Sequence, residues 1–190
     1  MSEYTDYMAL LTDAASLQAL RGQLEEVVPW AHVELNFINE TGEVPPEAQW
    51  AALPKPAWVT MSTPATADAL APLGTVLHLM AEEDFQSWGM EVLCGGEAWA
   101  YAMRAGPVAA EGGLLNGYPV LADPLADPSG VADLAACLAV DAAALTATLV
   151  PDGGQSFSAA LGIQYYVMQD QTLADPPATG RVQFHTMFEG

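Results

Sequence analysis

Residues 90–104 read MEVLCGGEAWAYAMR, and this stretch decides the class of fold. Two β-capable runs flank a Gly-Gly pair at 95–96, and both glycines can adopt the positive φ that a two-residue hairpin turn requires. In the second run Trp99, Tyr101 and Met103 alternate with alanines, which places them on one face of a strand. The stretch therefore predicts an antiparallel β-hairpin.

Further strands are predicted on both sides of this hairpin. Residues 31–37 alternate between apolar and polar side chains, which is the period of a half-buried strand. Apolar, β-branched and aromatic runs predict the remaining strands, at 57–62, 75–81, 118–121, 162–170 and 181–188. The last two of these strands are expected to form a pair.

Helices are predicted between the strands. Capping residues mark the start of four of them: Thr12 for a helix over 13–28, Thr63 with Pro64 for one over 64–73, and Ser129 and Asp141 for two short helices rich in Ala and Leu. Shorter helical pieces are expected at 45–53 and 82–88. Because strands and helices do not alternate strictly, we predict an α+β fold with a largely antiparallel or mixed sheet of about seven strands and four or five short helices packed on it.

One domain is expected over residues 1–190. A chain of 190 residues can bury a good core and is shorter than the size at which chains usually divide. The composition shifts to Gly, Pro and Asp at about 105–130, which predicts a long connection. The hydrophobic fraction of 52% excludes a disordered chain.

The charge balance is unusual because cations are scarce. The chain has 4 Lys+Arg against 24 Asp+Glu, a formal net charge of −20, although charged residues make up only 15% of it. Nucleic acids and anionic lipids both require Lys or Arg on the protein that binds them. Direct binding to DNA, RNA or a membrane is therefore disfavoured.

The same scarcity bears on location. The first residues carry acids where a signal peptide carries Lys or Arg, and no uninterrupted apolar run reaches the eighteen or so residues that span a bilayer. We therefore expect a cytoplasmic protein. Cys94 and Cys137 show no C-x-x-C or metal-ligand spacing, and are expected to be buried, reduced thiols.

Familiar catalytic motifs are absent from the sequence. There is no G-x-S-x-G nucleophile motif and no phosphate-binding glycine loop, so no cofactor is predicted. Residues 134–149 have the shape of a helix-turn-helix but no Lys or Arg to contact phosphates, so we interpret them as packing helices. The five tryptophans are interpreted mostly as core residues.

The three histidines form an alternative hypothesis. His32 and Glu34 share the polar face of the strand at 31–37, and His185 lies with Gln183 on the polar face of the last strand. With His78, these three imidazoles and a carboxylate would suit a catalytic Zn or Fe site if the strands were adjacent. No fixed ligand spacing such as H-E-x-x-H supports the site.

Groups of acids without local cations carry the leading hypothesis. The groups that we predict to contact a partner are Glu82, Glu83 and Asp84, and the spaced Asp123, Asp127, Asp133 and Asp141. Turn formation, helix capping and solubility explain each position individually, but not the scarcity of lysine over the whole surface.

We therefore predict a small acidic binding module that docks a basic protein partner, as an inhibitor, an immunity-type neutraliser of a nuclease toxin, or a mimic of nucleic-acid charge. The alternatives are a metal-dependent enzyme that uses the histidines with a nearby Glu, and a small-molecule binder with an aromatic-lined pocket. The sequence makes no prediction about oligomeric state.

Overall fold

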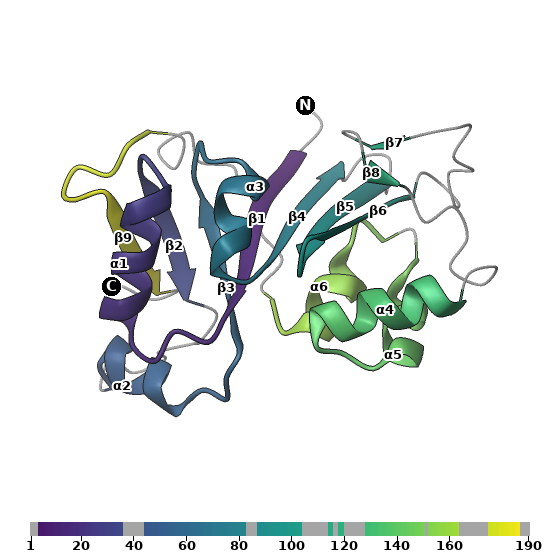
Figure 1. The fold of residues 1–190 in the computed structure, drawn as a ribbon, viewed down its shortest axis with the longest axis horizontal. Helices are drawn as coiled ribbons and strands as arrows, with labels where there is room; N and C mark the ends of the chain where they lie inside the picture. The colour runs from purple at the N-terminus through teal and green to yellow at the C-terminus, as the bar shows by residue number, and fades with distance from the viewer. Residues whose placement is uncertain are drawn as a thin grey trace.

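The fold is an α+β arrangement built on a seven-stranded mixed sheet (Figure 1). The computed structural model describes residues 4–35, 44–82, 87–103, 114–115, 118–119, 128–150, 152–163 and 175–186. The main sheet contains β1 (Tyr4–Thr12), β2 (Ala31–Leu35), β3 (Ala57–Ser62), β4 (Thr75–Glu82), β5 (Ser87–Cys94), β6 (Glu97–Met103) and β9 (Val182–Thr186). The short strands β7 (Leu114–Leu115) and β8 (Tyr118–Pro119) pair with each other. The helices are α1 (Leu17–Val27), α2 (Pro46–Ala52), α3 (Ala67–Leu70), the 3-10 helix η1 (Ala71–Leu73), α4 (Pro128–Leu138), α5 (Ala142–Thr148) and α6 (Gln155–Leu161).

The strand order of the main sheet is β6-β5-β4-β1-β3-β2-β9. Every neighbouring pair is antiparallel except β2 and β9, which run parallel. The predicted fold class is therefore confirmed. The pairing predicted between the last two strands is not tested, because residues 164–170 lie outside the described residues, as does most of the predicted connection at 105–130.

The hairpin predicted from residues 90–104 is confirmed. Cys94 at the end of β5 pairs with Glu97 at the start of β6. The two residues between them are Gly95 and Gly96, with φ of 60° and 88°. Both turn residues thus occupy the left-handed region that glycine enters without a steric penalty.

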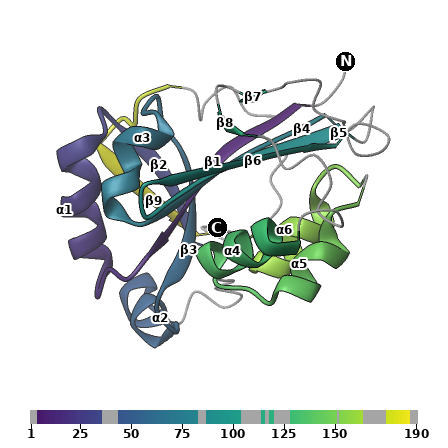
Figure 2. The same cartoon turned by 45° about the vertical axis from the view of Figure 1, so that its right-hand side comes forward.

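Two layers of helices cover opposite faces of the sheet (Figures 1 and 2). Helices α4, α5 and α6 pack on the face of β1, β4 and β5 that carries Ala9 and Leu79. Helices α1, α2 and α3 pack on the other face, against residues such as Leu10 and Val33. Successive residues of β1 therefore enter different cores, and this strand is buried on both faces.

The N-terminal part of the chain differs from its prediction. Residues 4–12 form β1 at the centre of the sheet, where we predicted no strand. The helix predicted from residue 13 begins at Leu17, because Ser16 is its N-cap and accepts a hydrogen bond from the backbone N–H of Ala19. The Thr12 hydroxyl instead accepts from Ala14 N–H at 3.2 Å, in the turn that follows β1.

Two other predictions require correction. The helical piece predicted at 82–88 is wrong at its ends, since Glu82 ends β4 and Ser87 begins β5. Helix α6 was not predicted, and Gly162 ends it in the left-handed conformation instead of beginning a strand. The pieces predicted around 45–53 and from Asp141 are confirmed as α2 and α5.

The prediction that both cysteines are reduced is wrong in this structure. Cys94 and Cys137 form a disulfide with a Cα–Cα distance of 5.9 Å across a sequence separation of 43 residues. The reason is the packing of α4 on the sheet, which places its last turn beside the end of β5. Sequence spacing does not reveal this proximity.

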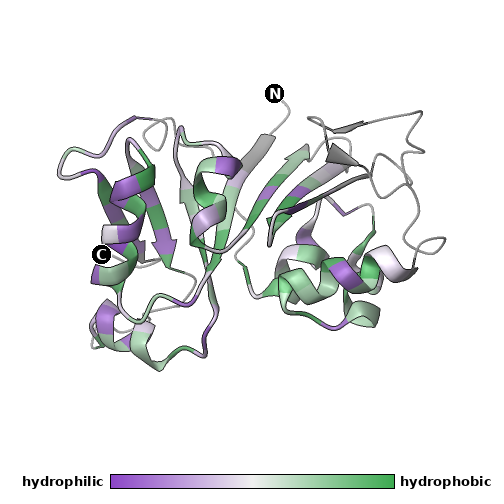
Figure 3. Cartoon of the chain, in the orientation of Figure 1, coloured by the Kyte–Doolittle hydropathy of each residue, from purple (hydrophilic) through white to green (hydrophobic). Residues whose placement is uncertain are grey.

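Helices α4 and α5 are rich in Ala and Leu and are mostly hydrophobic in Figure 3. No single helix in the described parts of the chain is long and apolar enough to cross a membrane. The segments Ser129–Leu138 and Ala142–Thr148 together meet such a test by length and composition, but they meet at an angle of 98°. Leu134, Leu138 and Leu145 are buried in the core that these helices form with the sheet.

Candidate functional site

Six polar residues form two cross-strand rows on β3, β2 and β9. They occupy the face of these strands opposite to Val33 and Val182, which are buried in the core beneath α1. The register pairs them as Ser62, His32 and Gln183 in one row and Thr60, Glu34 and His185 in the next. We call these six residues the polar patch.

His32 and His185 contact each other directly within the polar patch. Nδ1 of His32 lies 3.0 Å from Nε2 of His185, and the ring centroids are 5.2 Å apart. Nε2 of His32 lies 3.1 Å from the backbone oxygen of Asp175. A carbonyl only accepts, so Nε2 of His32 carries the proton, and its Nδ1 lone pair points towards His185.

Contacts with its neighbours position the His32 ring. The Trp30 and His32 rings pack in a T-shaped arrangement with centroids 5.8 Å apart, and His32 is only 8% exposed. Glu34 follows on the same face of β2 and pairs with His185 in the register of β2 and β9. The patch therefore combines two imidazoles and a carboxylate on a rigid sheet.

His78 does not join the other two histidines. It lies on β4, separated from β2 by β1 and β3, and it faces the side of the sheet opposite to His32. Its Nδ1 lies 3.3 Å from Oε2 of Glu91 on β5, and Oε1 of Glu91 is buried without a hydrogen-bond partner. The three-imidazole arrangement of the alternative hypothesis is therefore wrong, although two of its histidines are in contact and Glu34 lies on the same face of the sheet.

The predicted acidic contact residues are only partly described. Asp133 is exposed on α4. Asp141 is exposed and caps α5, where its Oδ1 accepts from Ala143 N–H at 2.9 Å and from Ala144 N–H at 3.0 Å. Glu82 ends β4, but its side chain is not described. The remaining four acids lie outside the described residues: Glu83, Asp84, Asp123 and Asp127.

Two of the four basic side chains contact β9 or the residues next to it. Arg21 on α1 donates to the backbone oxygen of Val182 and lies over the ring of Phe184 at 4.9 Å. Arg181, just before β9, donates to the backbone oxygens of residues 28–29. Both guanidinium groups thus satisfy carbonyls, and neither forms an ion pair with a described carboxylate.

Lys55 has a similar structural role. Its Nζ donates to the backbone oxygens of Trp50 at 2.6 Å and Leu53 at 3.4 Å, and it lies 4.1 Å from the Trp50 ring centroid. Loss of hydration lowers the pKa of Lys55 below its ordinary value. The fourth cation, Arg104, lies outside the described residues.

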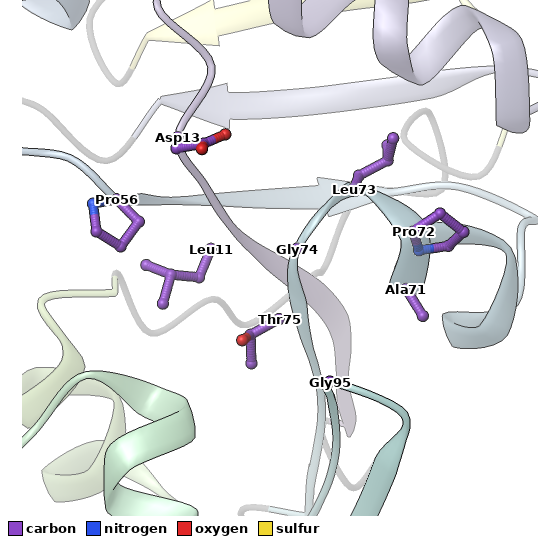
Figure 4. Close-up of a pocket in the computed structure, with 9 residues that line it drawn as sticks. All are labelled: Leu11, Asp13, Pro56, Ala71, Pro72, Leu73, Gly74, Thr75 and Gly95. Atoms are coloured by element: carbon purple, nitrogen blue, oxygen red, sulfur yellow. The ribbon is translucent and has the colours of Figure 1, made fainter.

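An open cavity of about 570 Å³ lies where η1, the start of β4 and the turn after β5 meet (Figure 4). Among the described residues, no aromatic side chain lines it, and Asp13 is the one titratable lining residue. Its lining residues are Leu11, Asp13, Pro56, Ala71, Pro72, Leu73, Gly74, Thr75 and Gly95. This cavity therefore does not provide the aromatic-lined pocket of the small-molecule hypothesis.

Comparison with known proteins does not identify the site. No protein-family model, curated protein or solved structure matches this chain. The described residues also contain no group of three His, Cys, Asp or Glu side chains arranged to hold a metal ion. What can be inferred about function therefore rests on the residues themselves.

Proposed function

We propose that this chain is an acidic binding module that docks a basic protein partner through the half built from β4–β6 and α4–α6. The observation that carries the proposal is the use of its cations. Arg21, Lys55 and Arg181 all lie in the other half, and each donates to backbone carbonyls and forms no ion pair with a described carboxylate. The described cations therefore do not pair with the exposed carboxylates of the docking half.

The docking half has exposed acids and no described Lys or Arg to balance them. Glu97 and Asp133 are both exposed. They flank the disulfide, because Glu97 pairs with Cys94 in the hairpin and Asp133 precedes Cys137 by one helical turn. Asp141 adds a third exposed carboxylate immediately after α4.

The negative electrostatic field of exposed carboxylates mainly affects the rate at which a partner associates. Complementary charge raises the association rate of a basic partner and repels acidic ones, and salt weakens the effect by screening. Inhibitor and immunity-type proteins need fast, selective capture of a basic target. The acidic surface therefore favours a binding module over the two alternatives, a metal-dependent enzyme and a small-molecule binder.

The test compares two variants with the same change in charge. The variants are E97K/D133K in the docking half and E25K/E26K on α1, each of which adds four positive units to the net charge. A basic protein recovered from the native host at low salt serves as the partner, and association and dissociation rates are measured across a salt series. E97K/D133K should slow association several-fold more than E25K/E26K at low salt, with a smaller change in dissociation.

Asp141 needs a gentler change because it caps α5. The variant D141N removes the charge and retains a good cap, so it should slow association without lowering stability. If E97K/D133K and E25K/E26K slow association equally, the partner is attracted by the net charge of the protein and not by the docking half. Binding that does not respond to salt would exclude electrostatic docking altogether.

A further inference from the structure

We propose that the polar patch is a binding site for a divalent transition-metal ion, with Nδ1 of His32 and Nε2 of His185 as its two imidazole ligands. Water would complete the coordination, and Glu34 on the same face is tested below as a further ligand. This site is separate from the acidic docking half, and it depends on different residues.

The distance between the two nitrogens fits cis ligands of one ion. Metal–imidazole bonds are about 2.0–2.1 Å long, so two such ligands are about 2.9 Å apart in octahedral and about 3.4 Å apart in tetrahedral geometry. Nδ1 of His32 and Nε2 of His185 are 3.0 Å apart. An ion with bonds of this length lies to one side of the line that joins the two nitrogens, so both rings would have to turn out of their direct contact to bind it.

The surroundings of His32 prepare it as a ligand. Its Nε2–H donates to the backbone oxygen of Asp175, which fixes the tautomer and aims the Nδ1 lone pair at the site. Metal-binding histidines usually have such a partner on the ring nitrogen that does not bind the metal. Binding requires the proton on Nε2 of His185 to move to Nδ1, so that the Nε2 lone pair can bind the ion.

The donor set indicates the class of metal. Two imidazoles suit Zn²⁺, Co²⁺, Ni²⁺ and Cu²⁺, whereas Mg²⁺ and Ca²⁺ prefer oxygen ligands. Glu34 lies on the same face and pairs with His185 in the strand register, so its carboxylate is the nearest candidate for a third ligand from the sheet. Because the described chain does not hold three ligands in place already, the ion would keep water-filled positions.

The chain contains a matched control. It has three histidines in total, and His78 lies on the opposite face of the sheet beside Glu91. The variants H32Q, H185Q and H78Q each remove one imidazole, but only the first two remove a proposed ligand. E34Q tests the carboxylate while keeping the shape of the side chain.

The experiment uses the full chain without a histidine tag, with Zn²⁺ in calorimetric titration and Co²⁺ in visible absorption. The parent and H78Q should bind one ion with equal affinity and give the same Co²⁺ spectrum. H32Q and H185Q should bind at least about tenfold more weakly, and E34Q should shift the Co²⁺ spectrum. Melting curves without metal show whether each variant is folded, and added Zn²⁺ should raise the melting temperature of the parent and H78Q only.

Two results would overturn the proposal. If the folded parent binds neither Zn²⁺ nor Co²⁺, the two rings form a plain imidazole–imidazole hydrogen bond. If H78Q weakens binding as much as H32Q, the ion binds elsewhere on the acidic surface. Neither result affects the salt-dependent docking test, because that test changes only carboxylates of α1, α4 and β6 and the N-cap of α5.

Discussion

Gly74 shows how strongly one residue can constrain this fold. It joins η1 to β4 with φ of 154°, and a Cβ atom at this position would overlap the backbone carbonyl of Leu11. The carbonyl belongs to β1, the central strand, which cannot move without disturbing both cores. Only glycine fits this close approach of two backbones.

We therefore predict that Gly74→Ala lowers the free energy of unfolding by at least about 2 kcal/mol, through overlap and backbone strain. Gly22→Ala is the control, because Gly22 lies exposed in α1 and an added Cβ would meet no atom within 4 Å. That change should stabilise the protein by about 0.5–1 kcal/mol. Urea denaturation of both variants measures the difference, and equal effects would contradict the proposed overlap.

For single residues, the sequence predicted which face of the strand several members of the polar patch occupy. The alternation around His32 and Glu34 correctly placed both on the polar face of their strand, and His185 was correctly placed on the polar face of the last strand. Sequence could not show that these strands are neighbours, because His32 and His185 are 153 residues apart in the chain. Nor could it show that His78 faces the opposite side of the sheet.

At the scale of elements, β1 is the most informative failure of sequence reasoning. Strands with one solvated face alternate between apolar and polar residues, and β1 does not because both of its faces are buried. Its Met, Ala and Leu residues are also good helix formers. The hairpin at 90–104 was predictable because its turn requires two glycines, whereas nothing local marks a central strand.

The disulfide joins two elements that sequence reasoning treated separately. It connects the end of β5 to α4 and closes a loop of 43 residues. The chain-entropy model gives about 4 kcal/mol for a loop of that length. Disulfides persist in oxidising compartments, so this bridge removes one argument for the cytoplasmic location, which stays a prediction.

We predict that C94S/C137S lowers the free energy of unfolding by up to about 4 kcal/mol, because the open chain gains entropy when it unfolds. Treating the parent with reductant should produce a similar loss. Thiol titration in denaturant without reductant should find no free thiol in the parent. Two free thiols there would return the cysteines to the reduced state that the sequence suggested.

At the scale of the whole molecule, the net charge produces a negative electrostatic field. The formal charge is −20, and the three described cations are engaged with carbonyls and aromatic rings. Self-repulsion among the acids opposes compaction of the chain. Composition alone predicted this property, but only the structure shows where the cations are used.

We predict that moderate NaCl raises the melting temperature of the parent, because salt screens repulsion between exposed carboxylates. E97K/D133K and E25K/E26K both change the formal charge from −20 to −20 + 4 = −16. Since repulsion grows with the square of the charge, each variant should lose roughly a third of the parent's rise between low and moderate salt. The melting temperatures of the two variants should therefore respond to salt in the same way, because both carry the same net charge. Their association rates with a basic partner should differ, because the charges are changed at different places on the surface. A parent whose melting temperature ignores salt would show that the acids are compensated locally, and the docking surface would then lose its electrostatic basis.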